Sequence, residues 1–222
     1  DGINDGPALK AADIGIAMGA GGSDVARSVA DVVIEDDNLH TMAEAVHQGR
    51  AIYRNIRKTV HYLLSTNFSE IEVMLGALLL GLGQPLTPMQ LLWINLVTDI
   101  FPGLALSLEP AEPDLMRQPP RPGSEPIITR RLGRMALESA LITGGALSAF
   151  LYGRATGGPN HGSTLAFHTL TTAQLLHALY CRSERQGLFN PGQREPNRWL
   201  ELALGGTAAL HMLAALLPST RR

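Results

Sequence analysis

The sequence has little charge, one cysteine and only two lysines among its 18 basic residues. Charged residues make up 17% of the 222 positions, against about 25% in an ordinary globular protein. Because 45% of the residues are hydrophobic, the chain is not a disordered linker. The net charge of −2 excludes nucleic-acid binding driven by positive charge. The single cysteine, Cys181, excludes an internal disulfide framework and a cysteine-rich zinc site.

The few charges leave long gaps. No Asp, Glu, Lys or Arg occurs from Ala155 to Cys181 or from Leu202 to Thr220. These gaps have the length of membrane spans, because about 20 apolar residues cross a bilayer as a helix. Asp1 and Gly2 follow no initiator Met and start no signal peptide, so we expect an internal piece of a longer protein.

Residues 1–50 differ from the rest, because short apolar runs alternate there with polar, helix-like stretches. Ser23 is placed to cap a helix. The segment is too short for a whole domain, so we expect the edge of an α/β sheet. The pattern predicts two helices and two strands, the second strand buried: helices at Pro7–Ala12 and Ser23–Ala30, strands at Ile14–Met18 and Val32–Ile34.

After residue 50 the chain is predicted to be mainly α, as a polytopic transmembrane helix bundle. A helix that begins after Asn38 and contains Gly49 would carry the chain into the membrane. Two glycines and two prolines between Gly81 and Pro88 predict a turn after it. The predicted segments are a stalk helix with a first span at 51–82 and further spans at 89–108, 132–152, 163–181 and 199–217.

Basic residues predict the orientation of these spans. Arginines are concentrated between the second and third spans and between the fourth and fifth, so both connections and the soluble part are expected in the cytoplasm. The excess of arginine over lysine indicates a bacterial genome rich in G and C, and hence a bacterial inner membrane. The arginines concerned are Arg117, Arg121, Arg130, Arg131 and Arg134, then Arg182, Arg185, Arg194 and Arg198.

Polar residues within the first two spans share helix faces. Asn67 and Glu70 lie three residues apart, and Asn95, Thr98 and Asp99 lie three and four apart. A bare carboxylate at the bilayer centre costs a few kcal/mol, so such residues are candidates for function. Calcium takes six to eight oxygen ligands, and these five side chains supply most of such a shell. The alternatives are hydrogen bonds between helices, which suit Asn and Thr, or a protonated acid.

Three other polar residues in the spans have open roles. Glu72 lies on a different face from Glu70. Three roles are open for it: a proton carrier, a side chain that extends to the membrane–water interface, or a partner of a neighbouring helix. His168 and His177 are nine residues apart and so fall on opposite faces of one helix. We expect packing or hydrogen bonding for both histidines, rather than metal ligation.

The first ten residues combine carboxylates, an amide and glycines ahead of a helix: Asp1-Gly2-Ile3-Asn4-Asp5-Gly6-Pro7-Ala8-Leu9-Lys10. They resemble the hinge motif of the phosphorylation domain of P-type ATPases. The stretches Asp36-Asp37-Asn38, Gly49–Tyr53, Gln90–Asp99 and Arg117–Arg121 resemble the C-terminal part of calcium-pump-like cation-transporting members of that family. The resemblance is strong over residues 1 to 130 and weak over the last three spans.

The resemblance implies an ATP-driven cation pump with a phosphoaspartate intermediate, and a divalent cargo such as calcium. Residues 1–50 would end a haloacid-dehalogenase-like phosphorylation domain, in which Asp1 binds catalytic magnesium and Asn4 and Asp5 lie beside the phosphoaspartate. The missing N-terminal parts of the same pump would be partners, with the lipid bilayer and the cation, and would bind most of the ATP. The five membrane positions match the family's cation ligands: Asn67, Glu70, Asn95, Thr98 and Asp99.

One position departs from calcium pumps with two ion sites. Those pumps carry a Glu in the eighth of ten spans, where this sequence has Gln174. The number of sites and the choice among calcium, manganese, magnesium and a monovalent ion therefore stay open. Two other functions remain alternatives: a non-catalytic membrane module that binds ions or regulates a partner, and a soluble haloacid-dehalogenase-like phosphatase, against which the uncharged spans argue.

Overall fold

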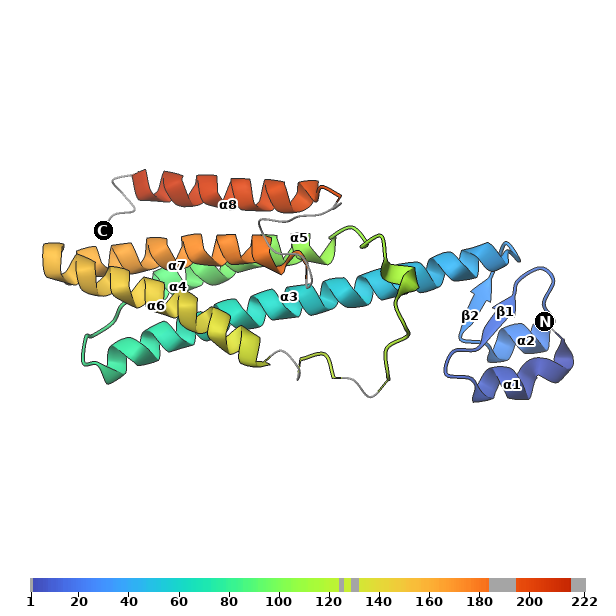
Figure 1. Cartoon of the computed structure of the whole chain (residues 1–222). Helices are drawn as coiled ribbons and strands as arrows, with labels where there is room; N and C mark the ends of the chain where they lie inside the picture. Colours follow the sequence, from blue (N-terminus) through green and yellow to red (C-terminus); the bar gives the residue numbers. More distant parts are fainter. Residues whose placement is uncertain (1, 124–125, 129–131, 184–194, 217–222) are drawn as a thin grey trace. The chain divides into compact units, whose positions relative to one another are not determined.

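The structure, a computed structural model, describes residues 2–123, 126–128, 132–183 and 195–216, and these are mainly helical (Figure 1). Internal contacts divide the chain into two units. The first unit is Asp1–Ala51 with Pro113–Gln118, and the second is Ile52–Glu112 with Pro119–Arg222.

The first unit contains a small α/β arrangement. The strands β1 and β2 pair in parallel, with Ile16 opposite Val32. Its other short elements are η1, a single 3-10 turn that precedes α1, and α2 between the strands. In order, the elements are η1 (Ile3–Asp5), α1 (Gly6–Ala11), β1 (Ile16–Met18), α2 (Asp24–Val29) and β2 (Val32–Ile34), with η3 (Leu115–Arg117) later in the chain.

Local signals in the sequence account for these elements. The Ser23 hydroxyl accepts a hydrogen bond from the backbone N–H of Ala26, which confirms the predicted N-cap of α2. β1 begins two residues later than predicted. A Cβ atom at Gly15 would lie 2.5 Å from the carbonyl oxygen of Leu9, so this position admits only glycine.

The prediction that β2 is buried was wrong for two of its three residues. Ile34 is 4% exposed, whereas Val32 and Val33 are 44% and 38% exposed. The reason is that the described sheet consists of β1 and β2 alone. A strand becomes buried throughout only when other elements cover both faces of its sheet, as in a larger parallel sheet.

The helix α3 (Leu39–Leu79) has 41 residues and begins in the first unit. The side chain of Asn38 accepts a hydrogen bond from the backbone N–H of His40, which caps the first turn. Gly49 does not interrupt the helix. At about 1.5 Å per residue the helix is roughly 60 Å long. Gly81 and Gly83, with φ of +64° and +83°, make the predicted turn after it.

The second unit is a helix bundle. α4 and α5 form one span that is interrupted by a π-helical segment, η2, and α6 and α7 lie side by side (Figure 1). The helices after α3 are α4 (Pro88–Trp93), η2 (Ile94–Asp99), α5 (Ile100–Ser107), α6 (Leu132–Gly157), α7 (Pro159–Cys181) and α8 (Arg198–Leu216).

Three described segments are long and apolar enough to cross a membrane: Pro88–Ser107, Leu132–Gly157 and Arg198–Leu216. They overlap the spans predicted at 89–108, 132–152 and 199–217. The spans predicted at 51–82 and 163–181 correspond to α3 and α7, which are helical but contain more polar residues. Those two spans stay predictions.

The connection between α6 and α7 is shorter than the sequence indicated, because both helices extend past the predicted ends at Tyr152 and Ser163. Only Gly158, with φ of +88°, separates them, and Pro159 starts α7. A Cβ atom on Gly153 would lie 2.8 Å from the Cα of Gly162. These glycines let the two helices pack at very short range.

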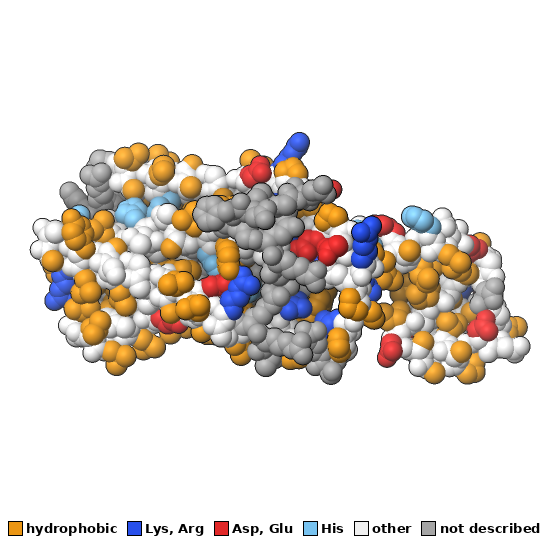
Figure 2. Space-filling view, viewed as in Figure 1, with side chains coloured by type: hydrophobic (Ala, Val, Ile, Leu, Met, Phe, Trp, Pro, Cys, Tyr) orange, Lys and Arg blue, Asp and Glu red, His pale blue; other side chains and the backbone are white. Residues whose placement is uncertain are grey.

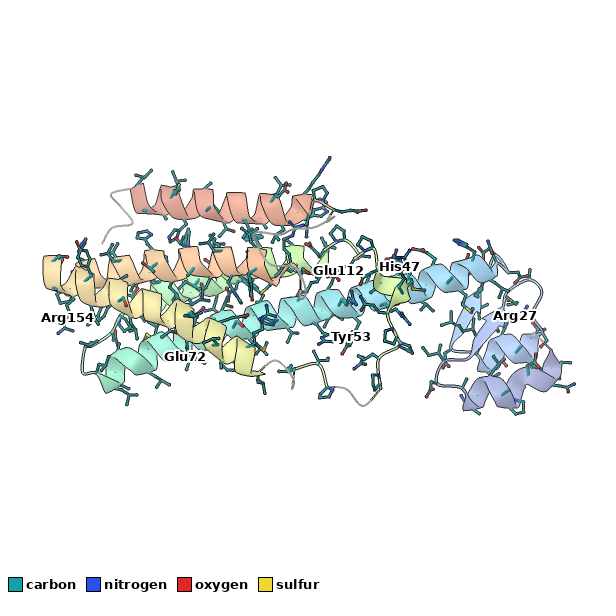
Figure 3. All side chains as sticks on the ribbon, viewed as in Figure 1. Arg27, His47, Tyr53, Glu72, Glu112 and Arg154 are labelled. Carbon is teal, nitrogen blue, oxygen red and sulfur yellow. The ribbon has the colours of Figure 1, made fainter. Side chains whose placement is uncertain are left out.

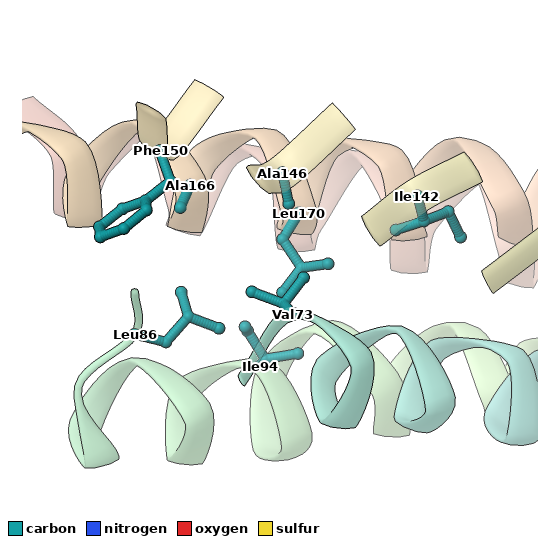
Figure 4. Packing of buried hydrophobic residues seen from close by; sticks show 8 residues of the cluster. All are labelled: Val73, Leu86, Ile94, Ile142, Ala146, Phe150, Ala166 and Leu170. Atoms are coloured by element: carbon teal, nitrogen blue, oxygen red, sulfur yellow. The ribbon is translucent and has the colours of Figure 1, made fainter. Parts of the chain in front are cut away.

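The bundle has an apolar core and an apolar surface. Buried side chains from α3, η2, α6 and α7 meet in one cluster that includes Val73, Ile94, Phe150 and Leu170 (Figure 4). Many hydrophobic side chains are also exposed on the surface (Figure 2), such as that of Leu141, which is 69% exposed. In a membrane such a surface faces lipid, so the chain is an integral membrane protein.

Candidate cation site

A buried row of polar side chains lies along one face of α3. Tyr62, Thr66 and Glu70 are four residues apart, so they lie above one another on the helix. Tyr62 and Thr66 are fully buried and Glu70 is 6% exposed. This row faces residues of η2 and α7, which lie far from it in the sequence.

The π-helical turn of η2 brings two polar residues into the bundle. Thr98 and Asp99 are buried, whereas Asn95 is exposed. A π-helix has a wider turn than an α-helix and often occurs at functional sites. A regular α-helix was expected here, and that expectation was wrong. Asn95 and Asp99 nevertheless both contact α3, as their predicted common face requires, although Asn95 is more exposed.

The carboxylate of Asp99 is surrounded by hydroxyl and amide groups of α3. Thr66 Oγ1 donates to Asp99 Oδ2 at 3.2 Å, and Asn67 Nδ2 lies 3.5 Å from the same oxygen. The Tyr62 hydroxyl lies 3.1 Å from the carbonyl oxygen of Thr98 and 3.5 Å from Asp99 Oδ1. All these partners are neutral.

Glu70 has a similar environment. Asn95 Nδ2 donates to Glu70 Oε2 at 3.1 Å, and Gln174 Nε2 of α7 donates to Glu70 Oε1 at 3.2 Å. In the part of the chain that the structure describes, no Lys or Arg pairs with Glu70 or Asp99. Two buried carboxylates without a compensating positive charge are costly, because burial removes their hydration.

Two buried oxygens of the same cluster have no hydrogen-bond partner among the described residues: Thr98 Oγ1 and Gln174 Oε1. Buried polar atoms without a partner are rare in folded proteins. Oxygens of this kind can coordinate a hard cation together with carboxylates. The amide groups of Asn67 and Asn95 can also present oxygen instead of nitrogen after a rotation of the side chain.

Side-chain contacts therefore link four of the five predicted membrane ligands to the cluster, namely Asn67, Glu70, Asn95 and Asp99. Thr98 precedes Asp99 in η2. Sequence reasoning missed Tyr62 and Thr66. The available signal was that Tyr62, Thr66 and Glu70 follow one another at intervals of four residues.

The residues predicted to act in phosphorylation lie in the first unit. Asp1 lies outside the described residues. Asn4 is exposed, and Asp5 accepts a hydrogen bond from the backbone N–H of Gly2 at 2.8 Å. The carboxylate of Asp5 thus stabilises the tight turn at η1.

Glu72 and His168 make contacts between helices. Glu72 is labelled on α3 in Figure 3. It accepts hydrogen bonds from Ser139 and Thr143 of α6, each at 2.9 Å, as in the alternative that paired it with a neighbouring helix. His168 Nδ1 lies 2.7 Å from the Nε2 atom of His211 in α8.

Comparison with known proteins identifies the family. The family model described as cation transporting ATPase, C-terminus, matches residues 83–222. The chain is 46% identical over 187 residues to a calcium-transporting ATPase of Bacillus subtilis, an alignment that covers 83% of this chain and 21% of that protein. It is 40% identical over 209 residues to calcium-transporting ATPase 1 of Bacillus cereus, with 86% and 24% covered.

A probable cation-transporting ATPase F of Mycobacterium tuberculosis is 36% identical over 221 residues, with 99% of this chain and 24% of that protein covered. The chain thus spans about a quarter of the length of these relatives. The match of the family model to more than half of the chain, together with the oxygen-rich site between α3, η2 and α7, shows that the chain belongs to the family of P-type cation-transporting ATPases and carries its C-terminal region.

Proposed function

We propose that the chain is the C-terminal part of an ATP-driven pump that translocates a divalent cation, with calcium as the favoured cargo. The observation that carries this proposal is the pair of buried carboxylates, Glu70 and Asp99, which have only neutral partners among the described residues. One divalent cation between them balances both charges. Calcium is favoured because the relatives from Bacillus subtilis and Bacillus cereus are named calcium-transporting ATPases.

The cation would exchange its water for protein oxygens. Glu70 and Asp99 supply the charged ligands, Thr98 Oγ1 and Gln174 Oε1 are free to coordinate, and calcium accepts six to eight oxygens. Asn67 and Asn95 now donate to the carboxylates, so each would turn its amide oxygen toward the ion. A pump must also release its ion. The neutral donors would stabilise the two carboxylates after the ion has left, and they would thus favour its release.

Transport would be driven through the first unit. In this proposal Asp1 binds magnesium, Asn4 and Asp5 lie beside a phosphoaspartate, and ATP binds to parts of the pump outside this chain. All five predicted spans cross a bacterial inner membrane, and the soluble part and the basic loops face the cytoplasm. An Asp-Lys-Thr-Gly-Thr segment encoded upstream of Asp1 would supply the phosphorylated aspartate.

ATP-dependent uptake of radioactive calcium into inverted membrane vesicles tests the proposal, with the full-length pump that contains this chain. Asp99→Asn should abolish uptake, while Glu201→Gln, at an exposed carboxylate of α8, should leave it unchanged. Calcium binding without ATP-dependent uptake in the unmodified protein would instead favour a non-catalytic ion-binding module.

A further inference from the structure

A second cluster of metal-ligating side chains lies in the same bundle, apart from the carboxylates. His61 of α3 and His177 and Cys181 of α7 each offer one ligand atom, and these atoms all lie within 4.8 Å of one another. All three residues are buried, with exposed fractions of 7% to 8%. His177 and Cys181 are four residues apart, so both lie on the same face of α7.

The distances suit a tetrahedral metal ion. Cys181 Sγ lies 3.4 Å from His177 Nε2, and the three ligand atoms all lie within 4.8 Å of one another. Zinc bonds of about 2.0–2.3 Å to nitrogen, sulfur and oxygen place neighbouring ligands roughly 3.3–3.8 Å apart. Small side-chain movements therefore bring the three ligand atoms to bonding distance. We propose that His61, His177 and Cys181 bind a zinc ion, a site distinct from that of the transported cation.

Glu138 of α6 acts in this proposal as a positioning residue. Its carboxylate accepts a hydrogen bond from His61 Nε2, and Arg134 Nε holds the second carboxylate oxygen at 2.7 Å. A carboxylate that binds one nitrogen of an imidazole leaves the other nitrogen to the metal and fixes the orientation of the ring. The site would thus connect α3, α6 and α7.

The donor set selects the type of metal. Imidazole nitrogen and thiolate sulfur favour zinc and similar transition metals, whereas calcium and magnesium prefer oxygen. Binding breaks the S–H bond of Cys181, forms a Zn–S bond and releases one proton to solvent. Zinc, one thiolate and the Glu138 carboxylate sum to zero charge. Arg134 pairs with Glu138 from a side chain that is 39% exposed, and it also contacts the ring of Tyr180.

The zinc cluster and the carboxylate cluster are adjacent but chemically separate. The ring of Tyr62 stacks on His177 with centroids 6.2 Å apart, and its hydroxyl faces Asp99. Gln174 precedes His177 by three residues on α7. The proposal does not depend on transport, because it concerns only which ion these three side chains hold.

The full chain, purified in detergent without a histidine tag and stripped with chelator, is titrated with Co²⁺ as a spectroscopic substitute for zinc. Because Cys181 is the single cysteine, a thiolate-to-cobalt charge-transfer band reports this site alone. We expect one Co²⁺ per chain, displaced by zinc. Cys181→Ser and His177→Gln should lose the band. Glu138→Gln should keep the band at saturation but weaken affinity by about 10- to 100-fold.

Two control variants separate this site from its neighbours. His211→Gln changes the other pair of close histidines, and Asp99→Asn changes the carboxylate cluster. Both should retain the cobalt band with unchanged affinity. The proposal is overturned if the unmodified, folded chain shows no thiolate band, or if the band persists in His177→Gln. The unmodified chain alone decides the first point, whether or not any variant folds.

Discussion

Carboxylates serve different purposes in the two units. In the first unit Asp5 and Asp36 accept hydrogen bonds from backbone or hydroxyl groups close to them in the sequence. In the second unit Glu70 and Asp99 are buried, and their partners lie 25 to 104 residues away in sequence. The same residue type thus stabilises a local turn in one place and forms a site for a cation in the other, and burial decides which.

The largest expected effect is at Glu70. Glu70→Gln removes one of two buried charges while it keeps the shape of the side chain, so the site would no longer balance a divalent ion. We expect calcium binding to the purified chain to be lost, as measured by isothermal titration calorimetry. The matched variant Glu44→Gln alters an exposed carboxylate of the first unit and should bind calcium normally. Equal affinity in both variants would remove the distinction between the two units.

Much of this contrast was visible in the sequence. Ser23 and Asn38 indicated the starts of α2 and α3, and spacings of three and four residues indicated Glu70 and Asp99. The π-helical turn of η2 was not predicted, because its six residues contain no Gly or Pro. The hydrogen bond between Gln174 and Glu70 was also beyond reach, since it depends on how α7 packs 104 residues away.

A second change sharpens the comparison by adding a carboxylate to the buried cluster. Gln174→Glu would place a third acid beside Glu70, where a second cation can neutralise it. We expect the unmodified protein to bind one calcium with a Hill coefficient of about one, and the variant to bind two. Asn160→Asp, which adds an acid at an exposed site, should leave the number unchanged. Two ions in the unmodified protein would contradict the single-site account.

A smaller effect is expected from the neutral partners of Asp99. Thr66→Val removes one hydroxyl at 3.2 Å from the carboxylate without changing volume greatly. This hydrogen bond stabilises the carboxylate before an ion binds, and its loss is worth about 1 kcal/mol, so calcium affinity should rise roughly fivefold. Thr164→Val, on the exposed side of α7, is the matched control. An unchanged affinity in Thr66→Val would exclude Thr66 from the site.

The smallest expected effect concerns an exposed carboxylate of the first unit. The Thr41 hydroxyl and the backbone N–H of Asn38 hold the pKa of Asp36 below its ordinary value of 3.8. Thr41→Val should raise this pKa toward 3.8, as measured by NMR titration of the carboxyl carbon. Because the pKa is lowered by folding, any stabilisation is present above the unfolded-state value and is lost as pH falls through the folded-state value. A pKa that does not move would show that the hydroxyl has no such role.

The central claim is that one divalent cation is bound between Glu70 and Asp99, and anomalous diffraction from crystals grown with strontium, a calcium substitute, tests it most directly. The account predicts one strontium peak coordinated by oxygens of both carboxylates, with Thr98 Oγ1 or Gln174 Oε1 in the same shell. Strontium bound elsewhere in the bundle, with the hydrogen bonds of Asn95 and Gln174 to Glu70 intact, would contradict it.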